Sequence, residues 1–381
     1  MDRREFLQNA AAVIAAAGLS TLNLDALEQP AEAVPGDTVG QTSADFAAGQ
    51  VSGNSAAGQA SAGFDAGGPS TSGATGTLEV LFLGTGAAGG KSEESLMRRR
   101  QRGSRQSSVL LDGRILVDLT ADALDLLPDG FVPECIFYTH SHSDHYAPKV
   151  AVEIGVPLVF VSETWAERAA ADFRAVAGPD ASCAGGATDC GNGRAVPEIV
   201  PLRTGQRVQR GDIFITALPA DHCPSDLHEQ ALIYLIEKGG TRLLYATDTS
   251  GIMGVAARMA GIDAHLKEDQ RVPITGLIME ATMARDDFRI FNHSSLEDVV
   301  RTVRILSETG CYRPEAGGCD SSEAAGGSDS SETADGCISS GAAVYVTHRS
   351  RSLHGGLSDD ELEASWPAPL KPARDGLVVR F

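Results

Sequence analysis

The chain of 381 residues has few aromatic residues, no long apolar run and fewer basic than acidic residues. Aromatic residues make up 5 % of the chain, whereas glycine contributes 42 residues, which predicts unstructured segments attached to a core of ordinary composition. The absence of 18 consecutive apolar residues excludes a multi-span membrane protein. The net charge of −20 gives no positive field that would attract nucleic acid. The seven cysteines form no CxxC pair, which argues against a zinc ribbon.

The first 33 residues have the pattern of an export signal. The pair Arg3 and Arg4 precedes a Phe-Leu dipeptide, an Ala-rich stretch covers residues 10–19, and residues 31–33 (AEA) form a small-x-small cleavage pattern. This order resembles a twin-arginine signal, so we predict export to the periplasm, cell envelope or medium, with the twin-arginine machinery as a partner. Cleavage and retention as an anchor both fit. An ordinary amphipathic helix is the alternative.

Three segments rich in small and polar residues are predicted to lack a packed core of their own. Residues 34–76 bury too little apolar surface to offset their ordering entropy and are predicted to form a flexible linker. Residues 177–194 and 310–341 predict surface insertions in a single domain that spans residues 77–381. These insertions contain Cys183, Cys190, Cys311, Cys319 and Cys337, for which the sequence leaves disulfides and free thiols equally open.

The predicted domain begins with a strand over residues 78–83 and a glycine-rich turn. The turn sequence GTGAAGG at residues 84–90 contains GxGxxG, which after a strand also occurs in dinucleotide-binding folds. Such a fold requires an apolar helix next, but residues 91–102 carry four Arg and two Glu. We therefore predict a tight turn followed by a charged loop. Its Arg cluster is either solvated or able to receive an anionic substrate.

The most informative segment is an apolar strand that runs into a cluster of His and Asp. The strand over residues 135–139 is followed by His140, His142, Asp144 and His145. Imidazole and carboxylate groups are ligands that zinc, manganese and iron accept. A buried structural histidine explains one such residue but not three beside an Asp. The segment therefore predicts a metal site.

Other predicted strands end in residues that can complete this site. They are residues 213–219 followed by His222, residues 242–246 followed by Asp248, residues 276–280 ending in Glu280, and residues 343–347 followed by His348. His293 follows the third of these strands. In α/β folds, functional residues lie where strands leave the sheet, so we expect these side chains to meet at one edge. Each of these residues alone could be an ordinary polar residue at the end of a strand. The prediction rests on the repetition of the pattern along the chain.

Together these motifs resemble the metallo-β-lactamase superfamily. The matching segments are GTGAAGG, THSHSDH at 139–145, ADH at 220–222, ATD at 246–248 and VTH at 346–348. The resemblance spans residues 77–381 outside the insertions and implies an α/β fold, the four-layer αββα sandwich, with two divalent metal ions at one edge. It implies that His140, His142 and His222 bind one ion, that Asp144, His145 and His348 bind the other, and that Asp248 bridges them. Zinc is the expected metal, with manganese and iron(II) as alternatives.

Two further stretches resemble particular branches of this superfamily. Residues 277–280 (LIME) and 292–296 (NHSSL) are similar to transfer-RNA 3′-processing ribonuclease and to the phosphoribosyl cyclic phosphodiesterase, and residues 347–350 (THRS) resemble the latter. In that phosphodiesterase, a Cys cluster after the first glycine turn and a His after the last metal-binding His hold a structural zinc. Here residues 91–110 contain no Cys and Arg351 takes the His position, so we predict that this zinc is lost.

The resemblance implies a hydrolase, most simply a phosphodiesterase in which a metal-bound hydroxide attacks phosphorus. Asp144 can orient the hydroxide, and His293 is either a proton donor to the leaving group or a helix-capping residue. The expected partner is a small anionic phosphodiester and not nucleic acid. A lactonase, thioesterase, arylsulfatase or non-catalytic binding protein on the same fold is the alternative. His228, His265 and His354 follow no predicted strand and are expected at the surface.

Overall fold

The computed structural model describes residues 76–87, 92–178, 195–224, 226–285, 292–314, 338–339 and 344–381. The predicted export signal, nearly all of the predicted linker and most of both predicted insertions lie outside these residues, with Cys183, Cys190, Cys319 and Cys337. Among the described residues, no helix has the length and apolar character needed to cross a bilayer.

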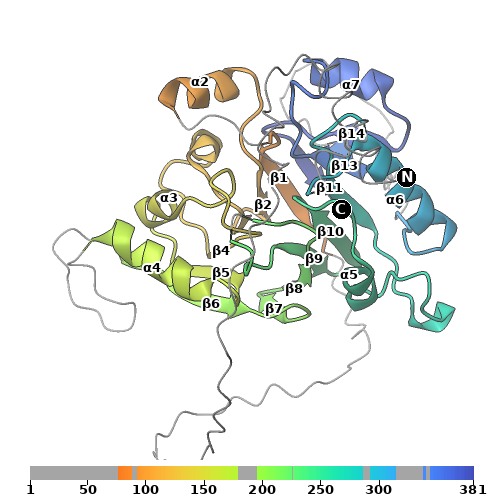
Figure 1. Cartoon of the computed structure of the whole chain (residues 1–381), viewed down its shortest axis with the longest axis horizontal. Helices are drawn as coiled ribbons and strands as arrows, with labels where there is room; N and C mark the ends of the chain where they lie inside the picture. Colours follow the sequence, from red (N-terminus) through yellow and green to blue (C-terminus); the bar gives the residue numbers. More distant parts are fainter. Residues whose placement is uncertain are drawn as a thin grey trace, which may run out of the picture. The chain divides into compact units, whose positions relative to one another are not determined.

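Two mixed β-sheets form the centre of the described fold (Figure 1). The first sheet has the order β12 (Ile338–Ser339), β15 (Val378–Arg380), β1 (Glu79–Gly84), β2 (Ser108–Leu111), β3 (Ile115–Val117), β4 (Cys135–Phe137), β5 (Leu158–Ser162) and β6 (Glu198–Leu202). The second has the order β14 (Leu370–Pro372), β13 (Val344–Thr347), β11 (Gly276–Glu280), β10 (Thr241–Ala246), β9 (Leu232–Lys238), β8 (Ile213–Pro219) and β7 (Arg207–Arg210). The strands predicted from the sequence are found within two residues of their expected bounds.

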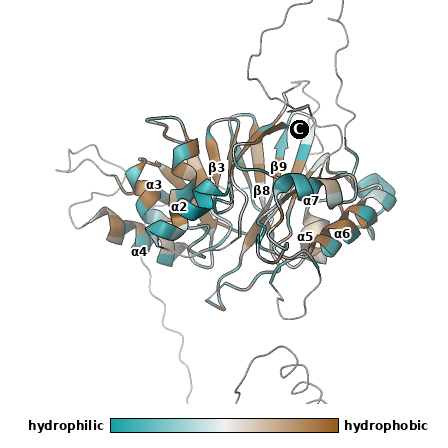
Figure 2. Ribbon diagram, turned by 90° about the horizontal axis from the view of Figure 1, so that it is seen from above, coloured by the Kyte–Doolittle hydropathy of each residue, from teal (hydrophilic) through white to brown (hydrophobic). Residues whose placement is uncertain are grey.

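Helices cover the outer face of each sheet, which completes four layers. The elements α2 (Glu93–Gln101), η2 (Ala121–Leu126), α3 (Pro148–Glu153) and α4 (Ala166–Ala177) accompany the first sheet. The elements α5 (Gly254–Met259), η3 (Glu268–Gln270), α6 (Leu296–Glu308) and α7 (Asp359–Ser365) accompany the second. Figure 2 shows α2, α3 and α4 on one side of the sheets and α5, α6 and α7 on the other. The predicted αββα sandwich is confirmed.

Strand β9 shows why the sheets are buried on both faces. Its alternate residues Leu232, Tyr234 and Ile236 pack between the two sheets, whereas Ile233 and Leu235 pack beneath the helices of the second sheet. Because successive side chains of a strand point to opposite faces, a continuous apolar run supplies both interfaces at once. The resulting rigid sandwich fixes the positions of the loops that leave its strands.

The expectation of a charged loop over residues 91–102 is wrong, because most of this segment forms α2. The hydroxyl of Ser92 accepts a hydrogen bond from the Ser95 amide at 3.2 Å and caps the helix. Two Glu occupy its first turn and three Arg its last, as the helix dipole favours. No residue of α2 is buried, so the sequence carries no apolar periodicity that would have revealed the helix.

The segment after α2 packs tightly against the glycine-rich turn. A Cβ atom on Gly84 would lie 1.9 Å from the carbonyl oxygen of Gln106, and one on Gly86 would lie 2.5 Å from the Ser104 hydroxyl. These two glycines are therefore required for the close approach of two backbones. Residues 88–90 of the predicted tight turn lie outside the described residues, whereas Thr85 accepts a hydrogen bond from the amide of Arg349, the residue after His348.

The second predicted insertion begins later in the chain than the sequence suggests. Cys311 and Tyr312 are buried in the core beneath the helices of the second sheet. The Cys311 thiol is free and contacts the carbonyl oxygen of Thr309 at 3.8 Å. Cys311 therefore contributes to the core as a small apolar side chain.

Candidate metal centre

All seven side chains predicted to bind metal meet at one edge of the sandwich. They are His140, His142, Asp144 and His145 in the loop after β4, His222 after β8, Asp248 after β10 and His348 directly after β13. Six of them are buried, and His142 is partly exposed. The strand-end prediction therefore places each candidate ligand in the same cluster.

Two of these strand ends have an unusual backbone conformation. Asp248 and His348 have φ angles of 49° and 47°, in the left-handed region that residues other than glycine rarely adopt. Asp118, which follows β3, has a φ angle of 59°. Backbone strain of this kind is typical of functional sites, where the surrounding structure holds a side chain in a required direction.

The first donor set contains His140, His142 and His222. One ring nitrogen of each lies within 4.8 Å of the others. Nε2 of His222 lies 3.2 Å from Nδ1 of His142. Two nitrogens bound to one tetrahedral zinc ion at its usual bond length are about 3.3–3.4 Å apart. The nitrogens of His142 and His222 are thus spaced as ligands of a single ion, and a nitrogen of His140 lies close enough to join them.

The second donor set contains Asp144, His145, His348 and Asp248. Nε2 of His145 lies 2.9 Å from Oδ2 of Asp248 and 3.7 Å from Oδ2 of Asp144. Nε2 of His348 lies 3.4 Å and 3.6 Å from the same two oxygens. These separations again match the edges of a tetrahedron around one ion.

The donor atoms themselves indicate that metal ions fit here. Nε2 of His140, His145 and His348 and Oδ2 of Asp248 are buried and make no hydrogen bond to any of the described residues. Unpaired polar atoms in the protein interior are costly, and each normally has an explanation such as a bound ion. The residues present therefore fit two ions, with Asp248 placed between the donor sets.

The two donor sets differ in the direction in which the pKa values of their histidines are shifted. Burial and the neighbouring histidines lower the pKa of His140 and His142, and burial lowers that of His222, so these rings are neutral near pH 7 and ready to bind metal. Burial opposes protonation of His145 as well, but Asp248 and Asp118 raise its pKa well above the ordinary value. Metal must displace a proton to bind His145, so loading of the second site should release protons.

The second ring nitrogen of three candidate ligand histidines is held by a partner. Nδ1 of His145 contacts Oδ2 of Asp118 at 2.7 Å, Nδ1 of His222 contacts the carbonyl oxygen of Asn292 at 2.9 Å, and Nδ1 of His348 contacts the Thr282 hydroxyl at 2.9 Å. Such partners fix the tautomer and the ring orientation, so that Nε2 faces the ion.

Asp118 is a functional residue that the sequence did not reveal. Its carboxylate is fully buried and accepts hydrogen bonds from the backbone N–H and the hydroxyl of Thr139, besides contacting His145. The only signal in the sequence was its position directly after the apolar residues 115–117. Its contacts show that it orients His145 and joins β3 to the start of the ligand loop.

We predict that Asp118→Asn weakens metal binding at the second site by about 10–100-fold, the usual effect of losing a partner of a metal-binding histidine. The three-His site should keep its affinity. Competition with a chromophoric chelator measures both constants. Asp122→Asn is the matched control, because Asp122 is equally buried but pairs with Arg99. Equal affinities in wild type and Asp118→Asn would contradict the role of Asp118.

Glu229 holds the ligand loop from its other side. Its two carboxylate oxygens accept from the backbone N–H and the hydroxyl of Ser141, each at 2.6 Å. Arg168 donates to the same carboxylate at 2.5 Å. Ser141 lies between two ligand histidines, so this contact joins the loop after β4 to the segment after His222. No pattern in the sequence predicts this contact.

His293 lies beside the second donor set. Its Nδ1 is 3.0 Å from Oε2 of Glu280 and 3.7 Å from Oδ1 of Asp248, and its ring stacks on that of His348 with centroids 5.4 Å apart. The capping role belongs instead to Ser295, whose side chain exchanges hydrogen bonds with Asp298. His293 therefore faces the centre rather than capping α6.

Glu280 anchors His293 and is a second residue whose role the sequence did not assign. Its side chain is completely buried at the end of β11 and also accepts hydrogen bonds from the Thr249 amide and the Thr282 hydroxyl. Burial raises the pKa of Glu280, but its bonds to His293 and His348 outweigh this and lower it. Glu280 is thus an ionised acceptor beneath both rings.

The prediction that three further histidines lie at the surface is correct for two. His228 and His265 are exposed. His354 is only 4 % exposed, and its Nε2 donates to the carbonyl oxygen of Ala281 at 2.7 Å. His354 lies in a turn that packs near Trp366, and turns carry no periodic pattern from which burial can be predicted.

Arg351 occupies the position at which the related phosphodiesterase has a His that binds the structural zinc. Here its side chain donates to the carbonyl oxygen of Arg102.

Comparison with known proteins agrees with this architecture. Residues 127–310 match the family model described as the beta-lactamase superfamily domain. No curated protein matches the sequence significantly.

Similar folds occur among solved structures. A diphosphatase from the PhnP family has a TM-score of 0.51 and 18 % identity, covering 80 % of this chain and 98 % of that one. The protein YhfI from Bacillus subtilis has a TM-score of 0.48 and 16 % identity over 80 % and 100 % of the two chains. The short form of human tRNase Z has a TM-score of 0.44 and 16 % identity over 79 % and 98 %. At these identities, similarity concerns the fold alone.

Proposed function

We propose that this chain, of which residues 127–310 match the beta-lactamase superfamily domain, is an exported binuclear metal-dependent hydrolase that cleaves a small phosphodiester. The observation that carries the proposal is the position of His293. Its ring stacks on His348 and lies 3.7 Å from Asp248, while Glu280 holds its Nδ1. A proton donor placed beside two metal sites suits the cleavage of an ester whose leaving group is a poor one.

When bound, two divalent ions supply Lewis acidity and a water nucleophile near neutral pH. Zinc is the first candidate because the donors are mainly imidazoles, and manganese and iron(II) accept the same donors. The residues that would hold the ions are His140, His142 and His222 for one, Asp144, His145 and His348 for the other, and Asp248 for both. The net charge of −20 disfavours binding of nucleic acid. We therefore infer that the substrate is a small anion, which the metal centre itself attracts.

Asp144 is placed to orient the attacking water. Its Oδ2 faces His145 and His348, which leaves Oδ1 to accept a hydrogen bond. Burial raises the pKa of Asp144, but the charges of the two histidines outweigh this and lower it, so the carboxylate stays ionised. An ionised acceptor can direct a lone pair of the water toward phosphorus.

His293 is placed to protonate the leaving oxygen. Its Nδ1 is engaged by Glu280, so Nε2 is the nitrogen available to a substrate. Burial lowers the pKa of His293, but the hydrogen bond and charge of Glu280 and the charge of Asp248 raise it above the ordinary value. The ring therefore carries near neutral pH the proton that a general acid must donate.

Turnover of matched substrates tests the reaction class. We expect metal-reconstituted protein to hydrolyse bis(p-nitrophenyl) phosphate with a higher kcat/KM than a lactone, a thioester or an aryl sulfate. A preference for one of the other three would assign the chain to lactonase, thioesterase or arylsulfatase chemistry. No turnover by protein with two bound ions would indicate a binding protein. Protein treated with a chelator is the control for metal-independent hydrolysis.

Export by the twin-arginine route is supported by the paired arginines before the apolar stretch. We expect Arg3→Lys together with Arg4→Lys to retain the precursor in the cytoplasm, because this route reads the arginine pair as an address. Cell fractionation and immunoblotting measure the distribution. The control pair is Arg203→Lys with Arg207→Lys, which makes the same change at exposed sites. Unchanged export of the first double variant would mean that the pair is not a signal.

A further inference from the structure

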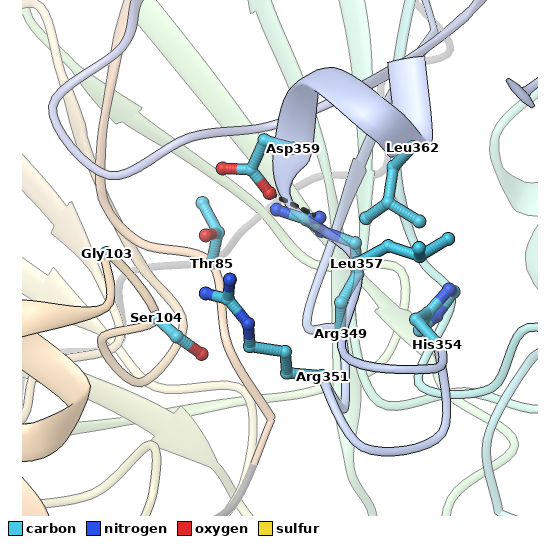
Figure 3. Close-up of a pocket in the computed structure, with 9 residues that line it drawn as sticks. All are labelled: Thr85, Gly103, Ser104, Arg349, Arg351, His354, Leu357, Asp359 and Leu362. Carbon is cyan, nitrogen blue, oxygen red and sulfur yellow. Dashed lines mark hydrogen bonds and ion pairs between the residues drawn. The ribbon is translucent and has the colours of Figure 1, made fainter. Parts of the chain in front are cut away.

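A pocket beside the loop that follows His348 contains none of the seven candidate ligands (Figure 3). One wall comes from Thr85 in the turn after β1 and from Ser104 in the segment after α2. The other comes from residues 349–362, which lead from β13 into α7. The pocket is open to solvent on one side. It adjoins the metal centre in sequence but has its own lining.

Two arginines line this pocket in a chain whose net charge is −20. Arg349 is 7 % exposed, and its two terminal nitrogens donate to Oδ1 of Asp359 at 2.8 Å and to the carbonyl oxygen of Ala373 at 2.6 Å. Figure 3 shows the pair with Asp359 as a dashed line. Asp359 therefore balances the charge of Arg349, but the buried Nε–H of Arg349 has no acceptor among the described residues.

Arg351 supplies the charge that is not balanced. Its Nη1 donates to the carbonyl oxygen of Arg102 at 3.0 Å, and within the described part of the chain no carboxylate lies at ion-pair distance. The charge of Arg351 acts on Glu361, but that carboxylate is held by the backbone N–H and hydroxyl of Ser358. Figure 3 shows the guanidinium of Arg351 reaching toward the Thr85 side of the pocket. A guanidinium with open donors favours a planar or tetrahedral oxyanion.

His354 adds an unpaired acceptor to the lining. Because its Nε2 donates to the carbonyl oxygen of Ala281, its Nδ1 carries a lone pair. This atom is buried and has no hydrogen-bond partner among the described residues. Burial also lowers the pKa of His354, which keeps the ring neutral near pH 7. The lining therefore holds one buried donor and one buried acceptor without partners, beside an unbalanced positive charge.

We propose that this pocket binds a phosphate group, either free hydrogen phosphate or the phosphomonoester end of a larger molecule. Its anionic oxygens match the guanidinium of Arg351 and the free Nε–H of Arg349. The hydroxyl of Ser104 lies on the opposite wall and can close the set of contacts. The site is a second anion site, distinct from the proposed reaction centre.

Titration of the full-length, metal-loaded protein with inorganic phosphate in a calorimeter tests this site. Arg351→Met should weaken the pocket's phosphate binding about tenfold or more, since it removes a charge-assisted contact. Arg380→Met is the matched control, because it removes the same charge from an exposed pair with Glu79. Ser104→Asp is an independent variant that should abolish binding by charge repulsion without altering an arginine. Metal content is measured on each sample.

Phosphate affinity that is unchanged in both Arg351→Met and Ser104→Asp would overturn the proposal. Kinetics separate the two sources of the phosphate group. If Arg351→Met raises KM more for a phosphodiester with a terminal phosphomonoester than for bis(p-nitrophenyl) phosphate, the pocket holds part of the substrate. Equal KM changes with lost phosphate binding identify free phosphate. The titration requires no turnover, so failure of the proposed function would leave this result readable.

Discussion

Asp248→Ala is expected to remove metal from both sites at once and to leave hydrolysis close to the uncatalysed rate. Oδ2 of Asp248 lies 2.9 Å from Nε2 of His145 and 3.4 Å from Nε2 of His348, and its charge also acts on His140 and His222. Loss of this shared carboxylate should therefore cost more than the ~10–100-fold in affinity that loss of an outer partner costs. Elemental analysis after reconstitution and dialysis measures the stoichiometry.

Controls separate loss of metal from loss of the fold. Asp263→Ala removes another buried carboxylate, which pairs with Arg258 at 2.9 Å, and should retain both ions. Asp248→Asn keeps the shape of the side chain and should fall between wild type and Asp248→Ala, because an amide oxygen ligates weakly without charge. Circular dichroism should give the same spectrum for all variants. One full ion per chain in Asp248→Ala would show that Asp248 serves a single site.

The clustering of the candidate ligands could be predicted because each lies in the segment that follows a strand in the sequence. His348 comes immediately after β13 and Asp248 two residues after β10. Strands that are buried on both faces can be recognised in the sequence as continuous apolar runs. The fold brings such strand ends to one edge whatever the loops between them contain. The candidate metal centre could therefore be recognised from short sequence patterns, each an apolar run followed by His or Asp, that recur along the chain.

The partners of the ligands were not predictable for the converse reason. Asp118 contacts a histidine 27 residues away, and Glu229 contacts Ser141 across 88 residues. Neither pair leaves a local pattern, because the contact exists only once two loops have been brought together. His354 shows the same limit, since its buried ring contacts Ala281 and Trp366, which are distant from it in sequence.

His293→Ala is expected to keep both ions but lose about 10²–10⁴-fold in kcat on an alkyl phosphodiester, the usual contribution of a general acid. The expected loss on an activated aryl ester is much smaller, because nitrophenolate leaves readily without a proton, whereas an alkoxide does not. The contact of 3.0 Å with Glu280 and the raised pKa of His293 are the features that give the ring its proton. Steady-state rates on the two substrates measure the difference.

The ratio of the two losses is what distinguishes proton donation from other roles of His293. Metal content must be measured on the same samples, because a lost ion would lower both rates. His293→Gln provides the decisive comparison, since its amide can hold a phosphate oxygen but cannot supply a proton. If His293 only binds phosphate, both substrates lose equally in the alanine variant and the glutamine variant recovers. If it is the general acid, the glutamine variant stays as slow as alanine on the alkyl ester. No loss on either substrate would remove the structural argument for phosphodiester chemistry, because the position of His293 beside Asp248 and His348 is what carries it.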